Sequence, residues 1–291
     1  MHPVVAHLVS GQVLFTGLPL MMAMILLRER ISRPDVRRLV TVMAWCFGLL
    51  GISTAAVPWW GLGMLPLSLG IWSVRGWRPE RIRLQRFVTV CPVAIACVFL
   101  TMEIGWVVRP SMSPVAERSI VVLGDSLSAG LGEGEGTPWP FQLRDWHHVQ
   151  VHNLSEAGAT TADALARIGT SDHFPGVVIV ELGGNDLLGG RALTDFERDL
   201  DGILAHLREK NRSVAMVELP LLPGTNAWGV VQRQLAQKYH CRLIPKRLLV
   251  QVLARPGATV DTLHLSQLGH RELAETIWSV VGQALPESSP Q

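Results

Sequence analysis

A serine, a histidine and an aspartate occupy positions in this 291-residue chain where they could supply a nucleophile, a base and an orienting acid. Ser126 stands in the run GDSLSAG, and Asp261 precedes His264 by three residues in the run DTLHLS. A serine hydroxyl becomes a good nucleophile when a base removes its proton, and imidazole is suited to that role near neutral pH. A nearby carboxylate can hold the other ring nitrogen and stabilise the imidazolium. These residue types predict a catalytic triad of Ser126, Asp261 and His264.

The elements that must position these residues follow an alternating pattern from Ser119 onward. The predicted strands are residues 119–123, 148–153, 177–181, 213–218 and 241–244, and the clearest helices are 194–210, 227–239 and about 266–284. Strands separated by single helices favour a parallel sheet with helices on both faces. Functional groups gather beyond the carboxyl ends of such strands. Ser126 follows the first predicted strand, as this rule requires.

Two further polar runs also follow predicted strands, namely NLSEAGATT after the second and GGND after the third. Together with GDSL and the DTLH run, they resemble the SGNH or GDSL family of hydrolases, whose marker residues match Ser126, Gly158, Asn185 and His264. The resemblance covers essentially residues 118–285. The runs GDSLSAG and GGND, with a loop that begins LPLLPG, look closest to the bacterial thioesterase, lysophospholipase and arylesterase branch.

The resemblance implies an α/β fold of the three-layer, flavodoxin-like type, with a parallel sheet, over residues 119–291. It also implies an oxyanion hole formed by the backbone N–H groups of Ser126 and Gly158 and the side-chain amide of Asn185. The implied chemistry is hydrolysis of a carboxylic ester through an acyl-serine intermediate, without a metal or a cofactor.

Other polar residues near these blocks have simpler structural interpretations. His270 is the chief rival to His264 as the base, but it falls inside the final helical pattern and no aspartate stands three residues before it. Asp125 and Asp186 are expected to hydrogen-bond within their own loops, as turn aspartates commonly do. The glycine-rich segment 130–136 lacks phosphate-loop spacing and is expected to be a loop that borders the active site.

The first part of the chain differs in charge and polarity from the part that carries these motifs. Residues 1–110 hold 11 basic and 4 acidic side chains, and residues 111–291 hold 15 and 20, so the two parts carry +7 and −5. The basic part is also the apolar one, which indicates a membrane as its partner and argues against nucleic acid. Nearly uncharged stretches predict four transmembrane helices in region 1–109, at about residues 3–27, 39–57, 59–75 and 87–108, with a linker at 110–118.

The arginines favour four spans over three. They cluster in two connections, Arg28 to Arg38 and Arg75 to Arg86, and cytoplasmic loops collect Lys and Arg. A single span between the two arginine clusters would place them on opposite sides of the membrane. A hairpin that turns at Pro58 puts both in the cytoplasm. This topology predicts a multi-pass protein of the cytoplasmic membrane with its catalytic domain outside the cytoplasm.

The expected substrate is an acyl ester carried by a lipid or by an acylated glycan, reached at the outer face of the membrane. An O-acetyl esterase of envelope polysaccharides remains open, as does an acyltransferase in which a sugar hydroxyl intercepts the acyl-serine. A non-catalytic membrane assembly component is the alternative from another class. The natural substrate, the acyl length and the oligomeric state are not specified by the sequence.

Overall fold

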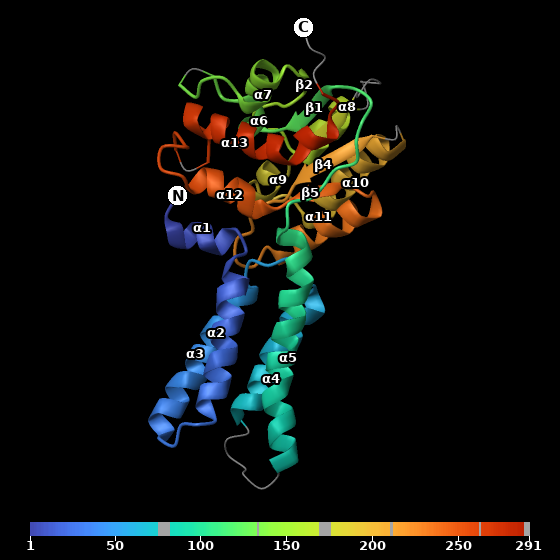
Figure 1. The fold of residues 1–291 in the computed structure, drawn as a ribbon. Coiled ribbons are helices and arrows are strands. Elements are labelled where there is room, and N and C mark those ends of the chain that lie inside the picture. The colour runs from blue at the N-terminus through green and yellow to red at the C-terminus, as the bar shows by residue number, and fades with distance from the viewer. Residues whose placement is uncertain (75–81, 133, 169–175, 210–211, 262, 288–291) are drawn as a thin grey trace. The chain divides into compact units, whose positions relative to one another are not determined.

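The computed structural model describes all residues except 75–81, 133, 169–175, 210–211, 262 and 288–291 (Figure 1). Contacts divide the chain into two compact units. We call residues 1–6, 108–220 and 231–291 the sheet unit, and residues 7–107 and 221–230 the helical unit. Each unit is described by itself.

The sheet unit is built on five parallel strands in the order β2-β1-β3-β4-β5. The strands are β1 (Ser119–Gly124), β2 (Gln150–Asn153), β3 (Val177–Glu181), β4 (Ser213–Val217) and β5 (Arg242–Ile244). Every residue of β1 and β3 is buried, as expected for the central strands of a parallel sheet covered on both faces. The predicted parallel sheet is confirmed, and the structure shows that its first and third strands are adjacent.

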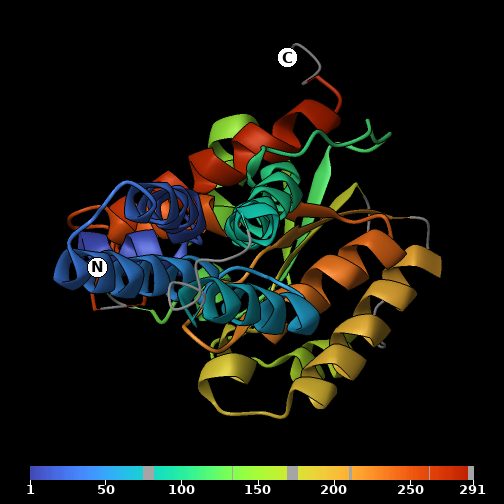
Figure 2. The same ribbon diagram turned by 90° about the horizontal axis from the view of Figure 1, so that it is seen from below.

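Helices cover both faces of this sheet. One face, which includes Ile120 and Ile179, packs in a single core with side chains of α7 (Trp139–His147), α12 (Lys246–Ala254) and α13 (Gln267–Val281). In Figure 2, α8 (Thr161–Ile168), α10 (Leu193–Glu209) and α11 (Asn226–Lys238) lie on the side of the sheet away from α13. Short helices α6 (Ser126–Ala129) and α9 (Gly184–Leu188) follow β1 and β3, and the 3₁₀ turn η2 (Gly282–Ala284) follows α13. The fold is therefore the predicted three-layer α/β arrangement.

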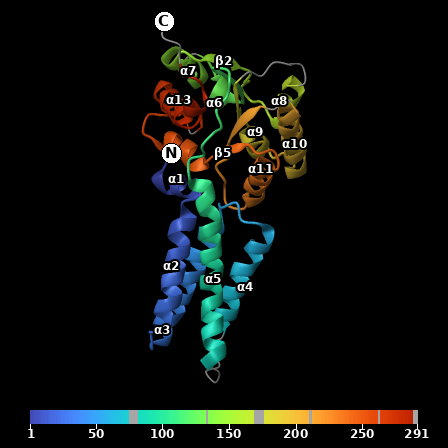
Figure 3. The ribbon, with the colours of Figure 1, turned by 45° about the vertical axis from the view of Figure 1, so that its right-hand side comes forward.

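The helical unit contains four longer helices beside one another (Figure 3). They are α2 (Val13–Arg28), α3 (Pro34–Ile52), α4 (Trp59–Val74) and α5 (Ile82–Val107), and the short helix α1 (Pro3–Val9) precedes them. Gly17 allows α2 and α3 to approach closely, because a Cβ there would lie 2.7 Å from the Phe47 carbonyl oxygen. Small residues permit this kind of close packing between apolar helices.

The lengths of these helices correct the prediction of four spans. Of the described helices, only Arg86–Val107 within α5 is long and apolar enough to cross a membrane. A second candidate arises only if α1 and α2, bent by 89° at their junction, are counted as one span. Helix α3 takes in Asp35, Arg37 and Arg38, and α4 has only 16 residues, whereas a span needs about 20 mostly apolar residues. Three arginines of the second predicted cytoplasmic cluster, Arg75, Arg78 and Arg81, lie outside the described residues.

Candidate active site

The turn after β1 places Ser126 at the start of a short helix. Asp125 is the N-cap of α6, and its Oδ1 accepts a hydrogen bond of 3.0 Å from the backbone N–H of Leu127. Gly124 is required at the strand end, because a Cβ there would lie 2.6 Å from Ser128 Oγ. The result is a tight strand-to-helix turn with the Ser126 side chain only half buried.

Asp261 and His264 form a hydrogen-bonded pair on the loop before α13. His264 Nδ1 lies 2.7 Å from Asp261 Oδ2, and the backbone N–H groups of Leu263 and His264 donate to Asp261 Oδ1 at 2.7 and 2.8 Å. The His264 hydrogen bond, followed by these two N–H groups, holds the pKa of Asp261 well below its usual range. Asp261 is therefore ionised at neutral pH, and its contact with Nδ1 leaves Nε2 of His264 as the nitrogen available for proton transfer.

The residue before Ser126 is a buried acid, Asp125, and burial raises its pKa to about 6. Within the described part of the chain, Ser126 and His264 are not hydrogen-bonded to each other. Catalytic hydrogen bonds are often long without substrate and tighten when it binds.

Gly158 and Asn185 come from the loops after β2 and β3. Gly158 has φ +80°, and a Cβ there would meet no atom within 4 Å, so its backbone borders open space. Asn185 Nδ2 donates to the Ala159 carbonyl at 3.0 Å and to Asp125 Oδ2 at 3.3 Å. The Asn185 amide thus links the residue after Gly158 to the residue before Ser126. The structure brings these two predicted site loops together beside the β1 turn.

A buried carboxyl group lies behind the β1 turn and was not singled out from the sequence. Glu181 Oε2 accepts a hydrogen bond of 2.8 Å from Ser128 Oγ and lies 3.5 Å from the backbone N of Asp125. Trp139 Nε1 donates to the same Ser128 Oγ at 3.2 Å. Burial raises the pKa of Glu181 well above its usual range, and the neighbouring Asp125 carboxyl raises it further. The sequence signal was a charged residue that ends an otherwise apolar buried strand.

Asp186 serves a different purpose from the one predicted. Its carboxylate accepts hydrogen bonds from the backbone N–H and the hydroxyl of Thr161, at 2.9 and 2.6 Å, and pairs with Arg191. Arg191 also contacts Asp199 of α10. Asp186 therefore ties its loop to the start of α8 rather than bonding within its own turn.

His270 is a structural residue, as the sequence predicts. It is fully buried within α13, and its Nδ1 accepts a hydrogen bond of 3.3 Å from the backbone N–H of Trp139. Its Nε2 lies 4.0 Å from Glu135, a buried residue of the glycine-rich loop. Searched over the described residues, the chain holds no group of three or more His, Cys, Asp or Glu side chains arranged to bind a metal ion.

Comparison with known proteins agrees with this arrangement. The model of the GDSL-like Lipase/Acylhydrolase family matches residues 122–272. The thioesterase 1/protease 1/lysophospholipase L1 of Escherichia coli K12 is 34% identical over 139 residues, which cover 45% of this chain and 67% of that protein. The esterase TesA of Pseudomonas aeruginosa is 27% identical over 175 residues, which cover 56% of this chain and 87% of that protein.

Solved structures show the same fold. The crystal structure of TesA matches with a TM-score of 0.52 at 27% identity and covers 57% of this chain and 99% of that one. The psychrotrophic esterase EstA from Pseudoalteromonas sp. has a TM-score of 0.52 at 21% identity, covering 57% of this chain and 98% of that one, and shows the fold alone. The family match spans more than half of the chain, including the end of β1, all of β3 and the loop that bears His264. The chain belongs to the GDSL-like lipase and acylhydrolase family of carboxylic ester hydrolases.

Proposed function

We propose that Ser126, Asp261 and His264 are the catalytic triad of this ester hydrolase. The observation that carries the proposal is the 2.7 Å contact between Asp261 Oδ2 and His264 Nδ1. It fixes the imidazole tautomer that leaves Nε2 unprotonated and able to accept the serine proton. No other histidine near the β1 turn offers this arrangement among the described residues, because His270 is enclosed within α13.

The proposed reaction proceeds in two halves. His264 Nε2 takes the proton of Ser126 Oγ as this oxygen attacks the substrate carbonyl carbon, and it then gives the proton to the departing alcohol or thiol. In the second half, His264 takes a proton from water, the hydroxide oxygen attacks the acyl-serine, and the proton returns to Ser126. The carboxylic acid is released and the enzyme is restored.

The carbonyl oxygen carries a developing negative charge in both halves. The proposed donors to it are the backbone N–H groups of Ser126 and Gly158 and the side-chain amide of Asn185. One N–H of this amide donates to Asp125 Oδ2 at 3.3 Å, the longer of its two contacts. An oxyanion would replace this acceptor while the contact to Ala159 continues to hold the amide in place. Preorganised donors of this kind stabilise the transition state.

The proposed substrates are acyl esters or thioesters, since the relatives described above include proteins named as an esterase and as a thioesterase and lysophospholipase. An ester panel from acetyl to long-chain acyl groups, on glycan and lipid carriers, tests the proposal. We expect Ser126→Ala to lose at least about 10³-fold in kcat on every substrate that the wild type cleaves, because the nucleophile is removed. Ser279→Ala, a remote serine of α13, is the matched control and should keep full activity. Equal hydrolysis by both variants would contradict the proposal.

We further propose that the helical unit anchors the enzyme in the cytoplasmic membrane, with the sheet unit outside the cytoplasm. Large apolar side chains on the outside of the helices support a lipid contact, since Leu39, Leu67, Phe87 and Val90 are each more than half exposed. A reporter that is active only in the cytoplasm should be silent when it is fused after Gln291. The same reporter should be active when it is fused within the first arginine cluster, between Arg28 and Arg38. A signal from the Gln291 fusion would exclude this orientation.

A further inference from the structure

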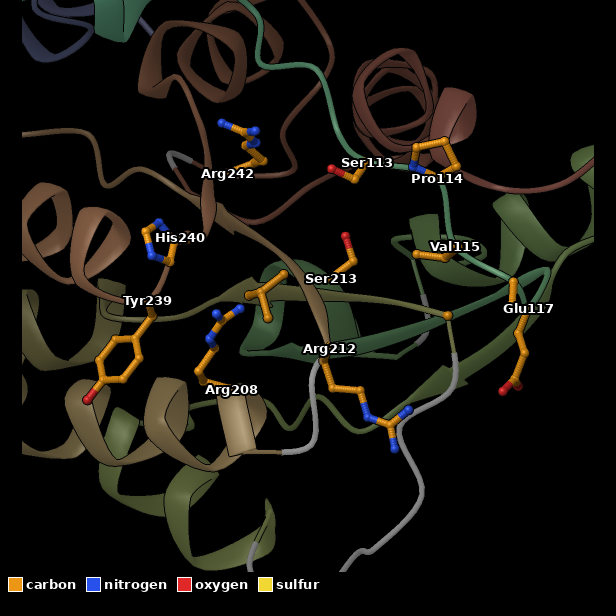
Figure 4. A pocket seen from close by; sticks show the side chains of 13 residues that line it. Ser113, Pro114, Val115, Glu117, Arg208, Arg212, Ser213, Tyr239, His240 and Arg242 are labelled. Atoms are coloured by element: carbon orange, nitrogen blue, oxygen red, sulfur yellow. The ribbon is translucent and has the colours of Figure 1, made fainter.

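A cavity of about 580 Å³ lies at the amino ends of strands β3, β4 and β5, within the sheet unit. Its wall is formed by residues 113–117, by the end of α10, and by Tyr239, His240 and Arg242, among others (Figure 4). Ser126 and Asn185 follow the opposite, carboxyl ends of β1 and β3. The cavity is therefore a separate site on the other edge of the sheet.

The wall of this cavity is strongly basic. Arg208, Arg212 and Arg242 all line it, and Glu117 is its one acidic lining residue among those described. Figure 4 shows Ser113 and Ser213 between Arg242 on one side and Arg208 and Arg212 on the other. Three positively charged side chains that line one cavity favour an anionic ligand there.

These arginines differ from most others of the sheet unit, which lie in ion pairs. Such pairs include Arg144–Asp145, Arg191–Asp186, Arg233–Glu218, Arg255–Glu272 and Arg271–Glu275. Across the described residues, no carboxylate lies within ion-pair distance of Arg208, Arg212 or Arg242. The Nε atom of Arg212 is moreover buried and without an acceptor. A buried donor without an acceptor costs free energy, so the site has unused capacity to bind an anion.

Helix dipoles account for only part of this cluster. Arg208 stands in the last turn of α10, where a positive charge favours the negative end of the helix. Arg212 and Arg242 lie beyond helices, directly before β4 and at the first residue of β5. All three line one cavity, and the helix dipole accounts for the position of Arg208 alone.

We propose that this cavity binds a phosphate group. Guanidinium groups match phosphate oxygens with paired N–H donors, and the Ser113 and Ser213 hydroxyls can donate to the same ligand. The volume exceeds that of a bare phosphate and falls in the range of small-molecule pockets, so the cavity has room for an organic part of the ligand. Two sources share this chemistry, a free phosphate ester and a phospholipid headgroup. The headgroup is a candidate that rests on the proposed membrane anchor, because Ser113 follows Val107, the last residue of α5, by six positions in the sequence.

Titration of the full chain in detergent with inorganic phosphate, at constant ionic strength set with chloride, tests the proposal by calorimetry. We expect saturable binding, and we expect Arg212→Gln and Arg242→Gln each to raise the Kd at least tenfold. Arg242 is exposed, so its replacement should not disturb folding, which circular dichroism would verify. The matched control is Arg271→Gln, an exposed arginine of α13, which should change the Kd less than twofold.

Two further probes, measured on the Ser126→Ala protein so that no ester is cleaved, distinguish the ligand sources. Glycerophosphoglycerol and water-soluble dihexanoylphosphatidylglycerol share the phosphodiester and both glycerol units and differ only in the acyl chains. Equal affinity for the two indicates a free phosphate ester, and at least tenfold tighter binding of the lipid indicates a headgroup. The proposal is overturned if no probe binds saturably, or if the Arg242→Gln and Arg271→Gln proteins bind phosphate equally well.

Discussion

The carboxyl group of Glu181 accepts a hydrogen bond of 2.8 Å from the hydroxyl of Ser128, two residues beyond the candidate nucleophile Ser126. The same oxygen faces the backbone N–H of Asp125 at 3.5 Å. The turn that carries Ser126 is thus held from behind by a buried side chain at the end of β3. This contact links the position of the nucleophile to the interior of the sheet.

Replacing Glu181 should therefore reduce both stability and activity. Glu181→Ala leaves the Ser128 hydroxyl without its acceptor, which costs about 1–3 kcal/mol and lowers the thermal midpoint by roughly 2–12 °C. Glu181→Gln keeps an acceptor oxygen and should recover most of kcat. The exposed Glu275 provides the control substitution to alanine. Equal thermal midpoints and equal kcat in the Glu181→Ala and Glu275→Ala proteins would show that the contact does not support the turn.

The same buried acids predict how stability depends on pH. Burial raises the pKa of Asp125 from 3.8 to about 6 and raises that of Glu181 well above 4.5. A carboxyl group with a raised pKa binds its proton more tightly in the folded state than in the unfolded state. Its contribution to stability is therefore complete below the unfolded pKa and is lost as the pH rises through the folded one.

Thermal midpoints of the wild type and Glu181→Gln, measured from pH 4 to pH 8, check this sign. The wild type should lose stability relative to the variant as the pH rises above about 4.5, because the glutamine side chain of the variant does not titrate. The raised pKa of Glu181 would be contradicted if the difference in thermal midpoint between the two proteins stayed constant with pH. It would also be contradicted if the wild type gained stability relative to the variant as the pH rises.

Asp261 should matter for the rate more than for substrate binding. Asp261→Asn removes the charge that stabilises the His264 imidazolium and permits the wrong tautomer, so kcat should fall by roughly 10²- to 10⁴-fold with little change in KM. Steady-state kinetics on a short-chain ester measure both constants. Asp145→Asn, an exposed aspartate of α7, is the control. If Asp261→Asn had the same kcat as Asp145→Asn, Asp261 would not be a member of the catalytic triad.

Asn185 should contribute through its amide donor. Asn185→Ala and Asn185→Asp both remove the N–H group, and each should lower kcat by roughly 10²- to 10³-fold. The aspartate variant retains the size of the side chain, so it separates loss of the donor from loss of packing. Wild-type kcat in Asn185→Asp would show that the amide does not face the oxyanion.

Features that depend on local sequence were predictable. Buried parallel strands consist of β-branched runs, so the positions of β1 and β3 followed from composition. The Asp261–His264 contact joins residues three apart and needs only one loop to form. The parallel direction of the strands then places both Ser126, after β1, and Asn185, after β3, at the carboxyl edge of the sheet.

Contacts between distant segments were not predictable in the same way. Glu181 and Ser128 are 53 residues apart, and Asp186 reaches Thr161 across 25 residues. Their pairing depends on which strands are neighbours and how the loops fold, which no local pattern encodes. The number of transmembrane helices was overestimated for another reason. The predicted span began at residue 39, where the charge-free stretch starts. The helix α3 itself begins at Pro34, so it includes the charged residue Asp35.

Labelling with a fluorophosphonate, followed by peptide mass spectrometry, tests the central claim most directly. This reagent phosphonylates a serine only when a base activates its hydroxyl. The full chain should take up one phosphonate, located on Ser126, and labelling should fall at least about 10²-fold in the His264→Ala protein. A label on another serine, or equal labelling after Ser126→Ala, would contradict the assignment of Ser126 as the nucleophile.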